Sequence, residues 1–131
     1  MMQDTTKRLL FWGKEIDVKF VFTKDSSGCV PKVEESAFED FVSHCANYDK
    51  GSLATLKSYI HANAAEILAY TSLPAMPRDV FRIVSLEAVR LYPSGTLAVF
   101  CDTSWDTHGL ALYYENGIWE AMTPDQLWFS T

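Results

Sequence analysis

The stretch from Asp102 to His108 concentrates the side chains with which this sequence could do chemistry. Asp102, Trp105, Asp106 and His108 fall within seven consecutive residues. Carboxylate and imidazole groups can ligate a metal ion or exchange protons. An indole ring can stack on a ligand or a partner, and we expect Trp105, as a loop residue, to be partly exposed.

One hypothesis is a small metal-dependent hydrolase or a ligand-binding module that uses this loop. A metal ion would need a further ligand from elsewhere, for which Glu115 and His61 are the candidates. Metal sites built from nearby residues usually show tighter repeats, such as HxH or HExxH. Asp and His in a loop between strands commonly bind backbone amides instead, and Gly109 supplies a turn conformation. We therefore favour a structural interpretation of the loop.

Cys101 precedes the loop and could form a nucleophilic pair with His108. It also ends an apolar run, and free cysteine is among the most buried residue types. Burial raises the pKa of a thiol and leaves it unreactive. The sequence has no glycine-rich phosphate loop, GxSxG motif or Walker-type lysine. We predict no catalytic residue, no metal and no cofactor.

The second half of the chain has the pattern of an antiparallel meander. Turn residues at 93–95 and 116–117 separate alternating apolar segments, and Asn-Gly is the strongest short hairpin signal. The predicted strands are residues 86–92, 96–101, 109–115 and 118–121. Thr123 and Pro124 then suit the start of a helical turn that would dock Trp128 or Phe129.

The first half predicts a hairpin followed by two helices. Residues 9–12 and 15–22 form the hairpin, since apolar residues alternate along the second run. Apolar spacings of three and four predict a helix after Pro31 up to Cys45. Residues 47–52 are interpreted as a break, with Ser52 as N-cap of a second helix that reaches about Tyr70.

The fold class predicted from these elements is α+β. An antiparallel sheet, made of the N-terminal hairpin and the C-terminal four-stranded meander, packs against two central helices. The chain of 131 residues, with 48% hydrophobic residues, is expected to form a single globular domain over residues 1–131.

The charge balance constrains the partner. Seventeen acidic residues against eleven basic ones give a formal net charge of −6. Nucleic-acid binding needs clustered Lys and Arg, so we expect none. An acidic surface favours a basic partner, although acidity also serves solubility alone.

Cysteine content and hydropathy indicate the compartment. Three widely spaced cysteines without a CxxC pair fit reduced thiols, and no apolar run reaches the 18 to 20 residues that span a bilayer. We therefore expect a cytoplasmic protein without a membrane segment.

The segment from Phe100 to Leu112 resembles the hallmark of a family of small uncharacterised bacterial proteins. That hallmark reads W-D-x-x-H-G-L, followed by an apolar strand and an Asn-Gly or Asp-Gly turn. The matching residues are Trp105, Asp106, His108, Gly109 and Leu110. This chain has one residue rather than two between Asp106 and His108, which shortens the loop.

Proteins of this kind are similar to cytoplasmic immunity proteins of bacterial toxin–immunity systems, which are compact, acidic and non-catalytic. The resemblance implies a protein that binds and blocks a cognate toxin domain, and the charge of the chain favours a basic one. A scaffold domain that self-associates through an edge strand is a further alternative. The expected partner-binding residues are Asp102, Trp105, Asp106, His108 and Glu115.

Overall fold

One six-stranded sheet carries the fold, with its strands in chain order from β1 to β6. The structure is a computed structural model that describes residues 4–23, 27–71, 79–124 and 126. The strands are β1 (Thr5–Phe11), β2 (Lys14–Val21), β3 (Val84–Leu91), β4 (Leu97–Thr103), β5 (Leu110–Glu115) and β6 (Ile118–Met122). Between β2 and β3 lie the helices α1 (Lys32–Ser43), α2 (Cys45–Ala62) and α3 (Ala64–Thr71), then a 3₁₀ helix, η1 (Val80–Arg82).

The sheet confirms the predicted hairpin and meander and joins them. β1 pairs with β2, and β3 to β6 pair in succession, all antiparallel. β2 and β3 pair in parallel, at Phe20 with Val89 and Val21 with Arg90. The α+β class is therefore confirmed as one mostly antiparallel sheet with helices, in which the helical segment is the crossover between β2 and β3.

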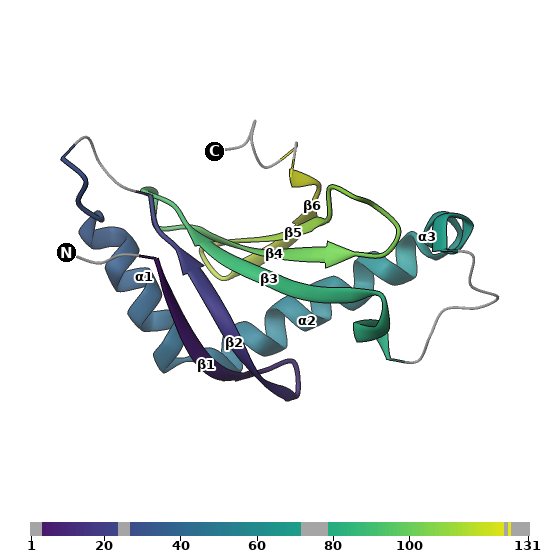
Figure 1. The fold of residues 1–131 in the computed structure, drawn as a ribbon, viewed down its shortest axis with the longest axis horizontal. Coiled ribbons are helices and arrows are strands. Elements are labelled where there is room, and N and C mark those ends of the chain that lie inside the picture. Colours follow the sequence, from purple (N-terminus) through teal and green to yellow (C-terminus); the bar gives the residue numbers. More distant parts are fainter. Residues whose placement is uncertain (1–3, 24–26, 72–78, 125, 127–131) are drawn as a thin grey trace.

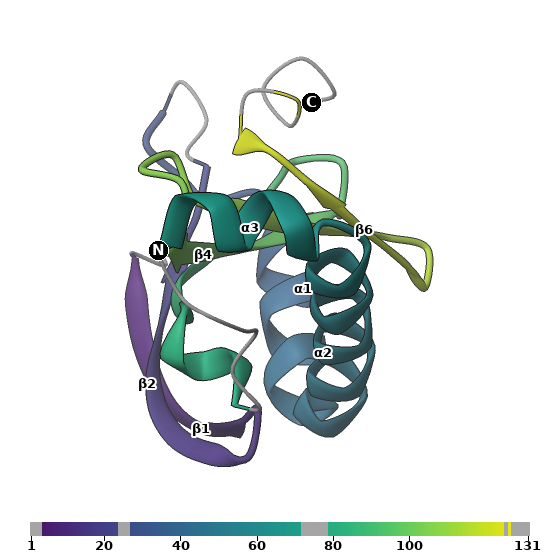
Figure 2. The same ribbon diagram turned by 90° about the vertical axis from the view of Figure 1, so that its right-hand side faces the viewer.

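The helices cover one face of the sheet. Figure 1 shows α1 and α2 on the same side of the strands. Figure 2 shows α1 and α2 side by side, with α3 running across the end of α2. None of the helices in the described residues is both long enough and apolar enough to cross a membrane.

Phenylalanines fill the layer between α1 and β2. Phe20 of β2 meets Phe38 and Phe41 of α1, with ring centroids 4.8 and 5.4 Å apart in edge-on geometry. Phe20 and Phe41 have no exposed surface. Burial of each such side chain stabilises the fold by about 1.5–3 kcal/mol. The inward-facing apolar residues of β2 therefore pack against the apolar face of α1, in agreement with the expected packing of the sheet against the helices.

The predicted break at residues 47–52 is wrong, because these residues lie inside α2. The chain breaks earlier, at His44, which separates α1 from α2. Ser52 is not an N-cap: it is fully buried, and its Oγ accepts a hydrogen bond of 3.0 Å from the Trp12 indole. Tertiary contacts therefore override the weak helix propensity of Gly51 and Ser52.

A second break divides the predicted helix from Ser52 to Tyr70, so the described part of the crossover holds three α-helices instead of the two predicted. At Asn63 the backbone N–H and the side-chain amide both donate to the Tyr59 carbonyl, at 3.1 and 2.9 Å. A side chain that bonds its own helix end competes with continuation of the helix. α3 therefore starts in a new direction at Ala64.

The hairpin turns follow the sequence. Asn116 and Gly117 both have positive φ, 50° and 80°, as a tight turn between β5 and β6 requires. After β6, Thr123 and Gln126 exchange hydrogen bonds between backbone and side chain, in agreement with Thr123 as a helix cap. The predicted docking of Trp128 or Phe129 lies outside the described residues.

Glu34, in the first turn of α1, is a buried carboxyl. It has no exposed surface, and its Oε1 accepts a 2.6 Å hydrogen bond from the Thr23 amide. Its Oε2 is buried without a hydrogen-bond partner among the described residues. Burial raises the pKa of Glu34 above its usual range, and the Thr23 bond opposes this only in part.

Replacement of Glu34 by Gln should change how stability depends on pH. The pKa of Glu34 is higher in the folded than in the unfolded protein, so the protonated side chain contributes to stability. This contribution to the free energy of unfolding is complete below the unfolded pKa and is lost as pH rises through the folded pKa. We expect the free energy of unfolding of Glu34→Gln to increase relative to that of the parent as pH rises from about 4 toward neutral. Denaturant unfolding across this range measures the difference.

The control is Glu39→Gln, which changes an exposed carboxyl of the same helix. A difference between Glu34→Gln and the parent that stays constant with pH would contradict the prediction.

Candidate functional site

The loop between β4 and β5 is held by its own polar groups. Oδ1 of Asp106 accepts the backbone N–H of His108 at 2.9 Å and lies 3.3 Å from Nδ1 of that residue. The Asp106 carbonyl accepts the Thr103 hydroxyl at 3.0 Å and the Gly109 amide at 3.1 Å. These contacts give Asp106 and His108 a structural role in the loop.

The five expected partner-binding residues do not form one group. Asp102 is exposed near the end of β4, and Trp105 is half-buried against the core. Glu115 is exposed at the other end of β5 from the loop. In the described part of the chain, no three His, Cys, Asp or Glu side chains lie close enough together to hold a metal ion.

Cys101 is buried in the core, whereas His108, considered above as its partner in a nucleophilic pair, is exposed. Cys101 is 2% exposed, whereas the His108 side chain is 75% exposed. Burial raises the pKa of the Cys101 thiol to about 12, and the carboxylates of Asp102 and Glu87 add to this effect. A thiol with this pKa is protonated at neutral pH and is a poor nucleophile.

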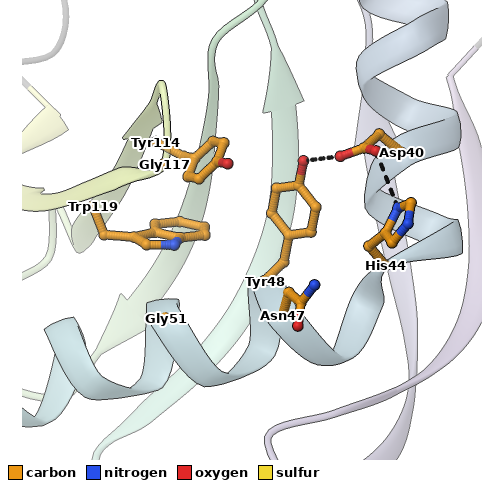
Figure 3. A pocket seen from close by; sticks show the side chains of 8 residues that line it. All are labelled: Asp40, His44, Asn47, Tyr48, Gly51, Tyr114, Gly117 and Trp119. Atoms are coloured by element: carbon orange, nitrogen blue, oxygen red, sulfur yellow. Dashed lines mark hydrogen bonds and ion pairs between the residues drawn. The ribbon is translucent and has the colours of Figure 1, made fainter.

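A surface hollow lies elsewhere, between the junction of α1 with α2 and the strands β5 and β6. Its volume is about 430 Å³. Figure 3 shows Tyr114 and Trp119 pointing from the strands toward Tyr48 of α2. We call it the aromatic hollow; its lining residues are Asp40, His44, Asn47, Tyr48, Gly51, Tyr114, Gly117 and Trp119.

Three aromatic rings form the inner wall of the aromatic hollow. Tyr114 and Trp119 are cross-strand partners of β5 and β6, with ring centroids 4.9 Å apart. The Tyr48 ring lies 5.0 Å from Tyr114 and 6.3 Å from Trp119. Tyr48 also contacts Phe41 of the core at 4.7 Å. The wall is therefore fixed by the core behind it.

Polar groups form the outer rim. The Tyr48 hydroxyl donates a short hydrogen bond to Oδ2 of Asp40, and Nδ1 of His44 lies 3.0 Å from Oδ1 (Figure 3). The side chains of Asp40 and His44 are 52% and 59% exposed. Burial, followed by the adjacent Asp40 carboxylate, raises the pKa of Tyr48 well above its usual range. Tyr48 is thus a neutral donor that orients Asp40.

The aromatic hollow was missed from the sequence because of the misplaced helix break. Asp40, His44 and Tyr48 recur at intervals of four residues, and in an unbroken helix this spacing would place them on one face. In the structure Asp40 is on α1 and Tyr48 is on α2, with His44 at the break between the two helices. Gly51 adds a signal, since a Cβ there would lie 2.5 Å from Nε1 of Trp119. A glycine inside a helix often marks such a close approach.

Comparison with models of protein families gives no match, and neither curated proteins nor solved structures match the chain. The function is therefore argued from geometry and charge.

Replacement of Gly109 by Ala should destabilise the protein more than replacement of Gly117. Both glycines have left-handed backbones, with φ of 75° and 80°. Such a conformation costs a residue with a Cβ roughly 1–2 kcal/mol. A Cβ at Gly109 would also collide with the Cys101 carbonyl oxygen, whereas one at Gly117 meets nothing within 4 Å.

Urea unfolding of the two variants measures the two losses of stability. Equal losses for Gly109→Ala and Gly117→Ala would show that the loop adjusts freely, contrary to our account of it as a fixed connection.

Proposed function

We propose that this protein is a non-catalytic cytoplasmic binding protein of the immunity type, which neutralises a cognate bacterial toxin by direct contact. The observation that carries the proposal is the aromatic hollow, in which three clustered rings lie beside the oriented carboxylate of Asp40. This combination suits recognition of a partner surface.

The aromatic side chains supply contact area at low cost in conformational entropy. Tyr and Trp dominate the binding energy of many protein interfaces, because they fill pockets and lose few rotamers. Trp119 is half-buried, with its indole against Gly51 of α2. A ring fixed before the partner arrives loses little freedom on binding.

The charge distribution supports a basic partner. The formal net charge is −6. Among the described residues, Arg8 and Asp17 form the one close ion pair between a carboxylate and Lys or Arg, at 3.2 Å. Most surface carboxylates of the described residues therefore have no Lys or Arg close to them. The resulting negative potential would speed encounter with a positively charged toxin domain.

None of the five residues expected from the sequence to bind the partner is among the residues that line the aromatic hollow. Glu115 is the neighbour of Tyr114 in β5, but successive side chains of a strand point to opposite faces, and Glu115 lines a separate hollow with Tyr113 and Ile118. Asp102, Trp105, Asp106 and His108 lie toward the opposite end of β5. We place the centre of the interface at Trp119. Contacts of the loop with a partner stay a prediction.

The test is co-expression of the chain with the product of the neighbouring gene, scored by growth and by co-purification. We expect the parent to bind and protect, and Trp119→Ala to weaken binding by roughly 30-fold, as for a central interface residue. Ile118→Ala is the matched control, because Ile118 is the preceding residue of the same strand and is 71% exposed outside the hollow.

Circular dichroism establishes that both variants are folded. Absence of protection by the parent, or equal effects of Trp119→Ala and Ile118→Ala, would overturn the proposal.

A further inference from the structure

We propose that the aromatic hollow receives a guanidinium group, that is, an arginine side chain of the partner. This inference rests on the proposed function and specifies the chemistry of recognition. The hollow, at about 430 Å³, falls in the size range of small-ligand pockets. Among the described residues its lining includes no Lys or Arg, and His44, which is cationic only when protonated, lies against the Asp40 carboxylate.

The Asp40 carboxylate can accept more than it does. An ionised carboxylate offers about four lone-pair positions. Tyr48 bonds Oδ2 and His44 lies against Oδ1, which leaves positions on both oxygens. Tyr48 and His44 hold the carboxylate in one orientation at the rim (Figure 3). A donor that presents two N–H groups in a fixed fork matches this arrangement.

The rings offer a surface for a flat cation. Tyr114 and Trp119 are inclined at 52° with centroids 4.9 Å apart, and Tyr48 is nearly perpendicular to Trp119, at 85°. A planar group can lie on one ring while its edge meets another. Trp and Tyr faces attract cations through the ring quadrupole, even at exposed sites.

Asn47 adds a further polar group to the lining of the aromatic hollow. It lies on α2 beside Tyr48 and is exposed within the lining of the aromatic hollow. Its carboxamide oxygen is a further acceptor for an N–H group of the cation.

Arginine fits these features better than lysine. A guanidinium is planar, stacks on aromatic rings and carries five donors, and it is more weakly hydrated than an ammonium. The hollow is open to solvent, since Asp40 and His44 remain more than half exposed. Contacts in such an open site offset poorly the free-energy cost of removing water from a compact, strongly hydrated ammonium group.

The experiment is an NMR titration of the full chain with the amide of N-acetylarginine, followed at the indole N–H of Trp119. Matched probes are the amides of N-acetyllysine, a compact cation, and of N-acetylcitrulline, a neutral isostere. We expect a saturable shift with the arginine probe and at least tenfold weaker binding of the other two. Equal binding of lysine, or equal binding of citrulline, would overturn the assignment of a guanidinium site.

A variant tests the role of the carboxylate. Asp40→Asn should weaken binding of the arginine probe by about tenfold, the usual effect of losing a hydrogen bond to a charged group. Glu39→Gln makes the same change of charge on the preceding, exposed residue of α1 and should leave binding within twofold. No saturable shift in the parent, or equal losses in the two variants, would refute the inference.

The two proposals fail separately. If Trp119→Ala abolishes protection but the arginine probe does not bind, the guanidinium inference is wrong and the proposed function stands. If the probe binds as expected but the parent gives no protection, the site is real and the proposed function is wrong.

Discussion

Two neighbouring residues in the middle of α2 hold the opposite edges of the sheet. Gly51 allows the Trp119 indole of β6 to approach the helix, and Ser52 accepts a hydrogen bond from the indole of Trp12, directly after β1. β1 and β6 are the two edge strands. One helix therefore fixes both ends of the sheet through two tryptophans, and the core phenylalanines fill the space between them. Each contact anchors the region of one edge strand to α2.

The same packing creates the aromatic hollow. The helical segment breaks at His44, one turn before Tyr48, so Asp40 and Tyr48 belong to different helices and yet bond to each other. Trp119, held against Gly51, forms the facing wall. Tyr48 thus connects the core to the aromatic hollow, whose inner wall is aromatic and whose rim carries the Asp40 carboxylate. Structural support and recognition share the same residues, which explains how a small domain can present rigid aromatic groups to a partner.

The sequence predicts those parts of the fold that depend on local patterns. Alternation marks β2, Asn116 and Gly117 set the last hairpin, and burial of Cys101 follows from its place in an apolar strand. The helix boundaries were wrong because Gly51 and Ser52 suit a turn when taken locally, and only the tryptophans that contact them explain their place in a helix. The hollow depends on the approach of residues about 70 positions apart, such as Tyr48 and Trp119, which periodicity does not reveal. The loop at 102–108 drew attention by its residue types, but Asp106 and His108 bond mainly within the loop.

The central claim is that partner recognition is centred on the aromatic hollow and not on the loop. The most direct measurement is NMR mapping of the isotope-labelled chain during titration with the purified product of the neighbouring gene. Our account predicts the largest shifts at the Trp119 indole and at the amides of residues 40–51 and 114–119. Shifts centred on residues 102–108, with the Trp119 indole unchanged, would contradict it.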